Sequence, residues 1–324
     1  MIRRLPGFAL LGLLLLSPFA QNAAAQGNVS PGGAEEPQAT FRSAVEVVSV
    51  SVAVRDSRGR VVRNLKQTDF EVLDSGRGKP ITDFWAGDAP ISLGILLDIS
   101  GSMAVSGNME RARAAVDIAL SNMRYGDEAA LYTFDSRLEE VVPFTTELDR
   151  VRRVSLEGRP WGMTSLFDAI AETARSAAER ANRHRALLVI TDGVDTGSKR
   201  TAPEVSGIAS AIDVPVYLLT VVNPLDHPGG DFSVVEMNEA SAAGTASLAD
   251  LARWTGGDMR VSSTPAHTVE GLQDLFVELR HQYVITFEPG AAVGWHPLEV
   301  RTRKKSHVVR ARSGYMTGPA RVGS

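Results

Sequence analysis

The chain has 324 residues, of which 44% are hydrophobic and 22% are charged, enough to bury the core of one large or two modest domains. Because it contains no cysteine, disulfide bonds, cysteine-ligated zinc, iron–sulfur clusters and thiol catalysis are excluded. The formal net charge of -4 lacks the overall basic character of a nucleic-acid binder, so we expect no nucleic-acid partner.

The first 25 residues have the pattern of a secretory signal peptide. Arg3 and Arg4 form a basic head, residues 8–16 an apolar run, and residues 23–25 are three alanines suited to cleavage. The run is shorter than the roughly 20 apolar residues that span a bilayer, and no other segment reaches that length. We therefore expect export to the periplasm or extracellular space, no transmembrane segment after cleavage, and a mobile linker over residues 26–40.

The next segment, residues 41–89, reads as strands and turns. Valines alternate over residues 45–54, with a change of phase near Val47 that suggests a bulge, and residues 56–59 form a turn. A second extended stretch covers residues 70–73 and ends in a glycine-containing turn. These patterns predict a β-rich N-terminal flank.

Residues 90–280 then alternate between apolar strands and amphipathic helices. The uninterrupted apolar run 91–97 is typical of a strand buried on both faces of a parallel sheet. Further strands are predicted over residues 129–134, 186–190 and 214–222, and helices over residues 109–123, 166–181, 205–212, 248–252 and 269–279. This alternation predicts an α/β domain with a doubly wound, mostly parallel sheet.

The chain returns to strands after the last helix. Apolar residues alternate over 283–287 and 298–300, and a further short strand follows at 308–309. The simplest architecture is an α/β domain inserted into a small β-rich domain that the flanks 41–89 and 281–317 build together, with a tail at 318–324. The two flanks packing separately is the alternative.

Oxygen-bearing side chains follow the predicted strands where an open α/β sheet places its ligands. Asp98, Ser100 and Ser102 follow the first apolar strand, Thr164 precedes a helix, and Asp192 follows the strand 186–190. Two carboxylates and three hydroxyls suit a hard cation such as Mg²⁺, Mn²⁺ or Ca²⁺. Asp and Ser in such loops can also serve only as helix caps, which is the alternative for the first motif alone.

This pattern resembles the metal-ion-dependent adhesion site (MIDAS) of von Willebrand factor A domains. Residues 162–170 and 189–193 are similar to that family around the ligands, and the resemblance covers residues 90–280. It implies that Ser100, Ser102 and Thr164 contact the metal, that Asp98 and Asp192 act directly or through water, and that a partner's Asp or Glu completes the coordination. The flanks resemble a bacterial group of exported proteins, and residues 223–247 look like an insertion.

Other charged and aromatic residues have simpler interpretations. Asp168 is expected to be an acid favoured by the dipole of its helix, and Asp195 a solvated loop carboxylate. The six histidines lack the spacing of zinc ligands. Six basic residues near the C-terminus are expected to form a solvated strand edge, namely Arg301, Arg303, Lys304, Lys305, Arg310 and Arg312. The tryptophans are expected in the core or at interfaces, at positions 85, 161, 254 and 295.

No catalytic motif accompanies these residues. The sequence lacks a G-x-S-x-G elbow, a Walker A loop, a G-x-G-x-x-G motif after a strand and an H-E-x-x-H motif. We therefore expect a metal-dependent protein-binding or adhesion module and no enzyme. The alternatives are a structural or assembly protein of the cell envelope that uses the metal only for stability and, less favoured, a metal-assisted hydrolase.

Overall fold

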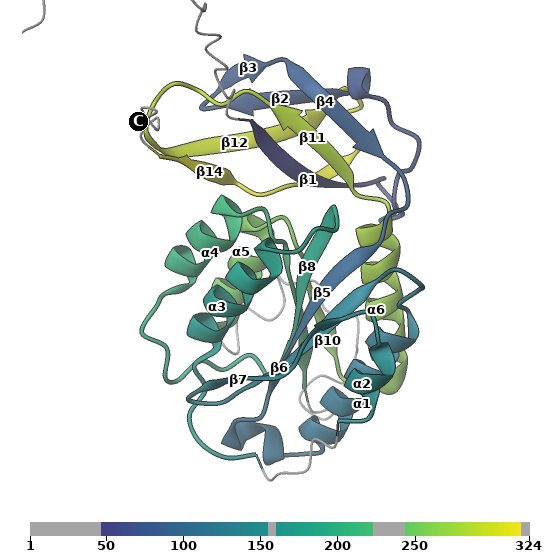
Figure 1. Cartoon of the computed structure of the whole chain (residues 1–324), viewed down its shortest axis with the longest axis vertical. Coiled ribbons are helices and arrows are strands. Elements are labelled where there is room, and N and C mark those ends of the chain that lie inside the picture. The colour runs from purple at the N-terminus through teal and green to yellow at the C-terminus, as the bar shows by residue number, and fades with distance from the viewer. Residues whose placement is uncertain (1–46, 155–159, 223–243, 319–324) are drawn as a thin grey trace, which may run out of the picture. The chain divides into compact units, whose positions relative to one another are not determined.

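The computed structural model describes residues 47–154, 160–222 and 244–318, with the side chains of 244–247 left out (Figure 1). The predicted signal peptide, the linker and nearly all of the tail lie outside these residues, as does most of the segment 223–247. Among the described helices, none combines the length and the apolar character needed to cross a membrane.

A six-stranded sheet forms the centre of the α/β region, in the order β10-β9-β8-β5-β6-β7. Neighbouring strands pair in parallel except β7, which runs antiparallel to β6 at one edge. The strands are β5 (Ile91–Asp98), β6 (Glu128–Phe134), β7 (Leu138–Thr145), β8 (His184–Thr191), β9 (Val216–Val221) and β10 (Met259–Ser262). Every residue of β5, β6 and β9 is buried, as the apolar run 91–97 predicted for β5.

Helices cover both faces of this sheet and create two apolar cores. One core joins the sheet to α1, α2 and α6, and the other joins it to α3, α4 and α5. The helices are α1 (Asn108–Ser121), α2 (Leu148–Arg152), α3 (Leu166–Ala178), α4 (Ala202–Ala211), α5 (Gly244–Trp254) and α6 (Pro265–Arg280). The doubly wound, mostly parallel fold class is therefore confirmed.

The flanking segments form two four-stranded antiparallel sheets around a third core. One sheet has the order β13-β1-β11-β4 and the other β14-β12-β2-β3, so each contains strands from both flanks. The N-terminal strands are β1 (Val48–Arg55), β2 (Phe70–Asp74), β3 (Arg77–Lys79) and β4 (Ile81–Ala86). The C-terminal strands are β11 (Tyr283–Phe287), β12 (Gly294–Thr302), β13 (Val308–Arg310) and β14 (Gly314–Thr317). Hence the flanks build one β-rich region together, and the alternative of separate packing is wrong.

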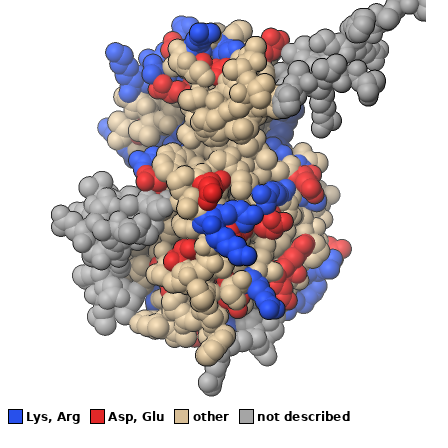
Figure 2. All heavy atoms as spheres, turned by 90° about the vertical axis from the view of Figure 1, so that its left-hand side faces the viewer, with Lys and Arg blue, Asp and Glu red and all other residues tan. Residues whose placement is uncertain are grey.

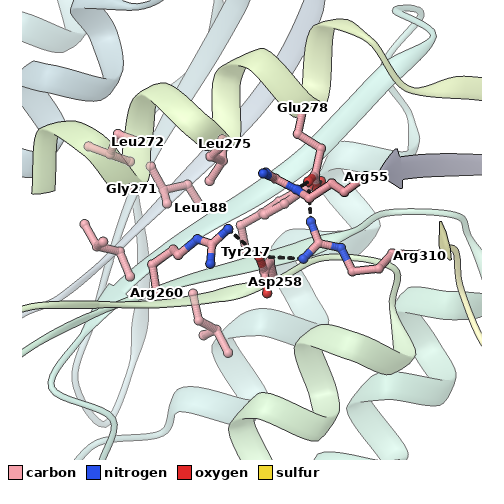
Figure 3. Close-up of a pocket in the computed structure, with 12 residues that line it drawn as sticks. Arg55, Leu188, Tyr217, Asp258, Arg260, Gly271, Leu272, Leu275, Glu278 and Arg310 are labelled. Carbon is pink, nitrogen blue, oxygen red and sulfur yellow. Dashed lines mark hydrogen bonds and ion pairs between the residues drawn. The ribbon is translucent and has the colours of Figure 1, made fainter. Parts of the chain in front are cut away.

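The chain crosses between the β-rich and α/β regions before β5 and after α6, at the amino edge of the central sheet (Figure 1). The buried carboxylate of Glu278 binds Arg55 there at 2.7 Å and also contacts Arg310, which binds Asp258 at 2.5 Å (Figure 3). Arg310 has an 18% exposed side chain, and Arg312 is buried near Asp213. For these two arginines the prediction of a solvated edge is wrong, because they neutralise carboxylates at the junction.

The surface view shows charges of both signs interspersed. Lys and Arg lie beside Asp and Glu on the face drawn in Figure 2, with broad uncharged areas between them. Trp85 and Trp254 are half-buried, whereas Trp161 and Trp295 are 81% and 44% exposed and lie outside the core.

Candidate functional site

The predicted ligands lie on three loops at the carboxyl edge of the central sheet, the edge away from the antiparallel sheets (Figure 1). Strands β5 and β8 are parallel neighbours in a register that pairs Leu97 with Ile190, so Asp98 and Thr191 follow side by side. The third loop, which carries Thr164, contacts the first through a hydrogen bond from Gly101 N to Gly162 O of 3.1 Å. The topology therefore brings all three predicted motifs to one place.

Asp98 is a fully buried carboxylate with both oxygens engaged. Its Oδ1 accepts the backbone N–H of Ser100 at 2.8 Å, and its Oδ2 accepts the hydroxyl of Thr191 at 2.6 Å. Burial and, to a smaller extent, the charge of Asp192 raise the pKa of Asp98, the hydrogen bonds from Ser100 and Thr191 oppose the rise, and the result is a pKa of about 6. A cation placed beside the two carboxylates would relieve both the burial cost and their repulsion.

The hydroxyls of Ser100 and Ser102 point to a common place. Their Oγ atoms are 3.2 Å apart, close to the separation of about 3 Å between adjacent ligands of an octahedral Mg²⁺ ion. Ser100 is buried and Ser102 is half-buried. The spacing therefore fits two hydroxyl ligands of one cation.

The two remaining predicted ligands, Thr164 and Asp192, lie on two loops that are hydrogen-bonded to each other. Thr164 is 3% exposed, its N–H donates to Thr196 Oγ1 at 2.9 Å, and its carbonyl accepts the N–H groups of Thr196 and Gly197, each at 2.9 Å. Asp192 is half-buried and accepts the N–H of Val194 at 3.3 Å. These bonds tie the loop of Thr164 to that of Asp192, although they do not fix where the Thr164 hydroxyl points.

Asp168 and Asp195 stabilise the start of α3 and the loop that follows β8. Asp168 accepts the N–H groups of Lys199 and Arg200 at 3.0 and 3.2 Å and forms an ion pair with Arg200, and these hydrogen bonds outweigh its burial and lower its pKa. Asp195 is half-buried and accepts the N–H of Leu166 at 2.8 Å and the Ser198 hydroxyl at 2.6 Å. The prediction that Asp195 is a solvated carboxylate is therefore wrong, because it caps a helix.

Sequence reasoning did not identify the residues that orient the ligands. Thr191 holds Asp98, and its Oγ1 also accepts the N–H of Gly193 at 3.0 Å. Thr196 holds Thr164 from a distance of 32 positions along the chain. The position of Thr191 at the end of an apolar strand was a usable signal, but no local pattern pairs Thr196 with Thr164.

The chemistry of this cluster suits a hard cation. All the candidate ligands present oxygen, as Mg²⁺, Mn²⁺ and Ca²⁺ prefer. No group of three or more His, Asp or Glu side chains able to hold a metal occurs within the described part of the chain, so hydroxyls must complete any cation site here.

Comparisons with known proteins identify the class of the α/β region. Residues 93–194 match the sequence profile of the von Willebrand factor type A domain, and this segment runs from β5 to the loop after β8 and contains all five candidate ligands. The similarity to this family thus covers about a third of the chain, all of it within the α/β region. No curated protein sequence matches the chain.

Solved structures with similarity to the chain are distant from it in sequence. An aerotolerance-related membrane protein from Bacteroides fragilis is 20% identical over 58% of this chain and 98% of its own, with a TM-score of 0.45. BatB from Bacteroides thetaiotaomicron is 19% identical over 57% of this chain and 96% of its own, with a TM-score of 0.42. A von Willebrand factor type A protein from Catenulispora acidiphila is 11% identical over 86% of this chain and 76% of its own, with a TM-score of 0.44.

Proposed function

We propose that this chain is a MIDAS-type binding module that takes up a divalent cation and thereby holds an acidic side chain of a partner protein. Asp98, Ser100, Ser102, Thr164 and Asp192 would hold the cation, which we expect to be Mg²⁺, with Mn²⁺ or Ca²⁺ as substitutes. The supporting observation is the buried carboxylate of Asp98, which lies near Asp192 and a pair of hydroxyls 3.2 Å apart. Among the described residues, neither carboxylate forms an ion pair with a basic side chain.

The chain's own residues explain why a carboxylate would be the preferred ligand. When bound, a divalent cation supplies a positive centre with a coordination position for an incoming oxygen. The hydroxyls of Ser100, Ser102 and Thr164 are neutral, so if Asp98 and Asp192 act through water, the direct contacts would leave the charge of the ion uncancelled. The hydrogen bonds from Ser100 N and Thr191 Oγ1 hold Asp98 in place behind the hydroxyls. An Asp or Glu of the partner would supply the missing negative charge.

We propose binding and no catalysis at this site. The sequence supplies no catalytic motif beside these ligands. Each oxygen of Asp98 accepts one hydrogen bond, and its remaining lone pairs would face the cation. The N-terminal signal pattern supports the further proposal that this binding takes place in the periplasm or the extracellular space.

The first part of the test is cation binding by the full chain. Calorimetric titration with Mg²⁺, Mn²⁺ and Ca²⁺ should give a saturable signal that Asp98→Asn and Ser100→Ala abolish. Ser121→Ala is the matched control, because this exposed serine on α1 bonds only the nearby carbonyl of Asp117 among the contacts described. Unchanged titrations in all three variants would contradict the proposed site.

The second part tests capture of a carboxylate. Displayed 12-residue peptides with a fixed central Asp should be retained by the chain in Mg²⁺ and released by EDTA, whereas the same library with a central Asn should not be retained. Retention that persists in EDTA would overturn the proposal. Cation binding that raises the thermal midpoint without any retention of the Asp library would assign the site to stability alone and would also overturn it.

A further inference from the structure

We infer that the partner presents its acidic side chain between large apolar side chains, an inference that rests on the proposed function. Four exposed apolar residues belong to the loops that carry the candidate ligands: Val105, Trp161, Met163 and Val194. We call these four residues the apolar rim. The apolar rim would contact the residues beside the partner's Asp or Glu. It would thereby select among partners that a cation alone cannot distinguish.

Each member of the apolar rim exposes a large part of its side chain. Trp161 is 81% exposed, Val105 60%, Met163 55% and Val194 49%. Single exposed apolar residues are ordinary on protein surfaces, but several that gather at one place mark an interaction site. Every member lies within three positions of a proposed ligand, so the loops that carry the polar centre also carry the rim.

Backbone contacts tie the rim to the polar centre. Trp161 N donates to Ile99 O at 3.1 Å, which places the tryptophan beside the loop of Asp98. Val105 N donates to Ser102 O at 3.1 Å, and Val194 N donates to the carboxylate of Asp192 at 3.3 Å. The apolar rim therefore belongs to the same loops that carry the candidate ligands.

Met163 is tied to the neighbouring loop as well. It lies next to Gly197, where an added Cβ would be 3.4 Å from the Met163 Cβ, and Gly197 N donates to the carbonyl of Thr164 at 2.9 Å. The three loops thus support one another, and the side chains of the rim are presented by a connected scaffold.

The centre is recessed below this exposed rim. Asp98 and Ser100 have no exposed surface, and Thr164 is 3% exposed. A recess of this kind favours one protruding carboxylate, whose flanking residues then meet the rim. Apolar flanks would gain most, because burying them against Trp161 and Met163 removes apolar surface from water and shields the carboxylate from solvent.

The experiment sequences the peptides that the full chain retains in Mg²⁺ from a displayed library with a fixed central Asp and random flanks. The chain should enrich Trp, Phe, Leu, Ile, Met and Val beside the Asp. The double variant Trp161→Ser/Met163→Ser should keep the requirement for Asp but lose the apolar preference, and one enriched peptide should bind it about tenfold more weakly. Trp295→Ser is the matched control, since it changes an exposed tryptophan on β12 and should leave the preference intact.

The outcomes separate this inference from the proposed function. Retention that requires Asp but shows no preference for its flanks, or the same preference in the double variant, overturns the inference and leaves the proposed function standing. Loss of the requirement for Asp overturns both. Sedimentation of the chain with phosphatidylglycerol vesicles in Mg²⁺, lost in the double variant, would assign the rim to a membrane surface and overturn the inference.

Discussion

The two edges of the central sheet differ in whether their carboxylates form ion pairs with basic side chains. At the amino edge, each of several buried or half-buried carboxylates contacts an arginine: Asp127 with Arg280, Glu128 with Arg180, Asp258 with Arg310, and Glu278 with Arg55. At the carboxyl edge, Asp98 and Asp192 lie near each other, and neither has a basic partner among the described residues. The same residue types are thus neutralised at one edge and left with uncancelled charge at the other.

This difference indicates which carboxylates stabilise the fold and which could bind a ligand. A buried carboxylate with a fixed arginine has no charge to offer a ligand, and its removal leaves a buried cation behind. A buried carboxylate without such a partner lowers the free energy of unfolding while no cation is bound. Binding of a cation raises that free energy again. The amino edge therefore joins the two regions of the fold, and the carboxyl edge is where we propose that a ligand binds.

The largest effect is expected from Glu278→Ala at the amino edge. This substitution leaves Arg55 and Arg310 without their shared buried partner and should lower the free energy of unfolding by about 4 kcal/mol. Chemical denaturation measures it. Glu172→Ala is the control, because its pair with Arg175 is exposed and should contribute about 1 kcal/mol or less. Equal losses in the two variants would break the comparison between the edges.

A pH dependence is expected from His184, which begins β8 at the amino edge and is fully buried against the edge of Trp85. Burial lowers the pKa of His184 to about 4, below the ordinary 6.5 of the unfolded chain. The unfolded state therefore binds a proton first, and stability should fall by about 3 kcal/mol as the pH drops from 6.5 to 4. Denaturation of the chain and of His184→Gln across this range tests it, and parallel profiles would contradict it.

His296 in the β-rich region should behave in the opposite sense. Its two ring nitrogens lie 2.8 Å from Ala292 O and 2.9 Å from Asp74 Oδ1, and these contacts raise its pKa above 6.5. The stabilisation is fully present below pH 6.5 and is lost as the pH rises through the raised pKa. In the His296→Gln variant this decline on the alkaline side should disappear, and a decline that persists would exclude His296 as its source.

The effect of Asp98→Asn on stability is expected to depend on the cation. In EDTA, Asp98→Asn removes an unneutralised buried charge and should change the free energy of unfolding by about 1 kcal/mol or less. With Mg²⁺ at a hundredfold excess over its Kd, the unmodified chain should gain about 2.7 kcal/mol and the variant nothing. Thermal unfolding under the two conditions measures both terms. An equal gain in the variant would show that the cation binds elsewhere.

The smallest effect on stability is expected from Trp161→Ser at the apolar rim. Because Trp161 is 81% exposed, its removal should change the free energy of unfolding by about 0.5 kcal/mol or less. A larger loss in chemical denaturation would mean that Trp161 supports the fold and would weaken the contrast between a structural edge and a binding edge.

Much of the fold followed from local pattern, because buried parallel strands must be apolar throughout. The runs at 91–97 and 186–190 predicted β5 and β8, and the helical stripe after Leu166 predicted α3. Strands β3, β4, β7, β10 and β14 were not predicted. They are short or partly exposed, so their residues carry no continuous apolar run and no clean alternation.

The candidate site was predictable as a set of residue types but not as a geometry. The order of Asp98, Ser100, Ser102, Thr164 and Asp192 behind the predicted strands was enough to nominate them. Asp195 was misinterpreted because a carboxylate that caps a helix from a distant loop has the same local sequence as a solvated one. Arg310 was misinterpreted for a similar reason, since its partners Glu278 and Asp258 are remote in sequence.

The sequence by itself determined the alternation of strands and helices, because apolar periodicity is a local consequence of which side chains must leave water. It also determined the chemical character of the candidate ligands, which are all oxygen donors. Only the tertiary structure decided which carboxylates are neutralised, because an ion pair depends on contacts between residues far apart in the chain. Only the tertiary structure showed that Trp161 and Met163 are exposed while Asp98 and Ser100 are buried, because the exposure of a side chain depends on how the whole chain packs.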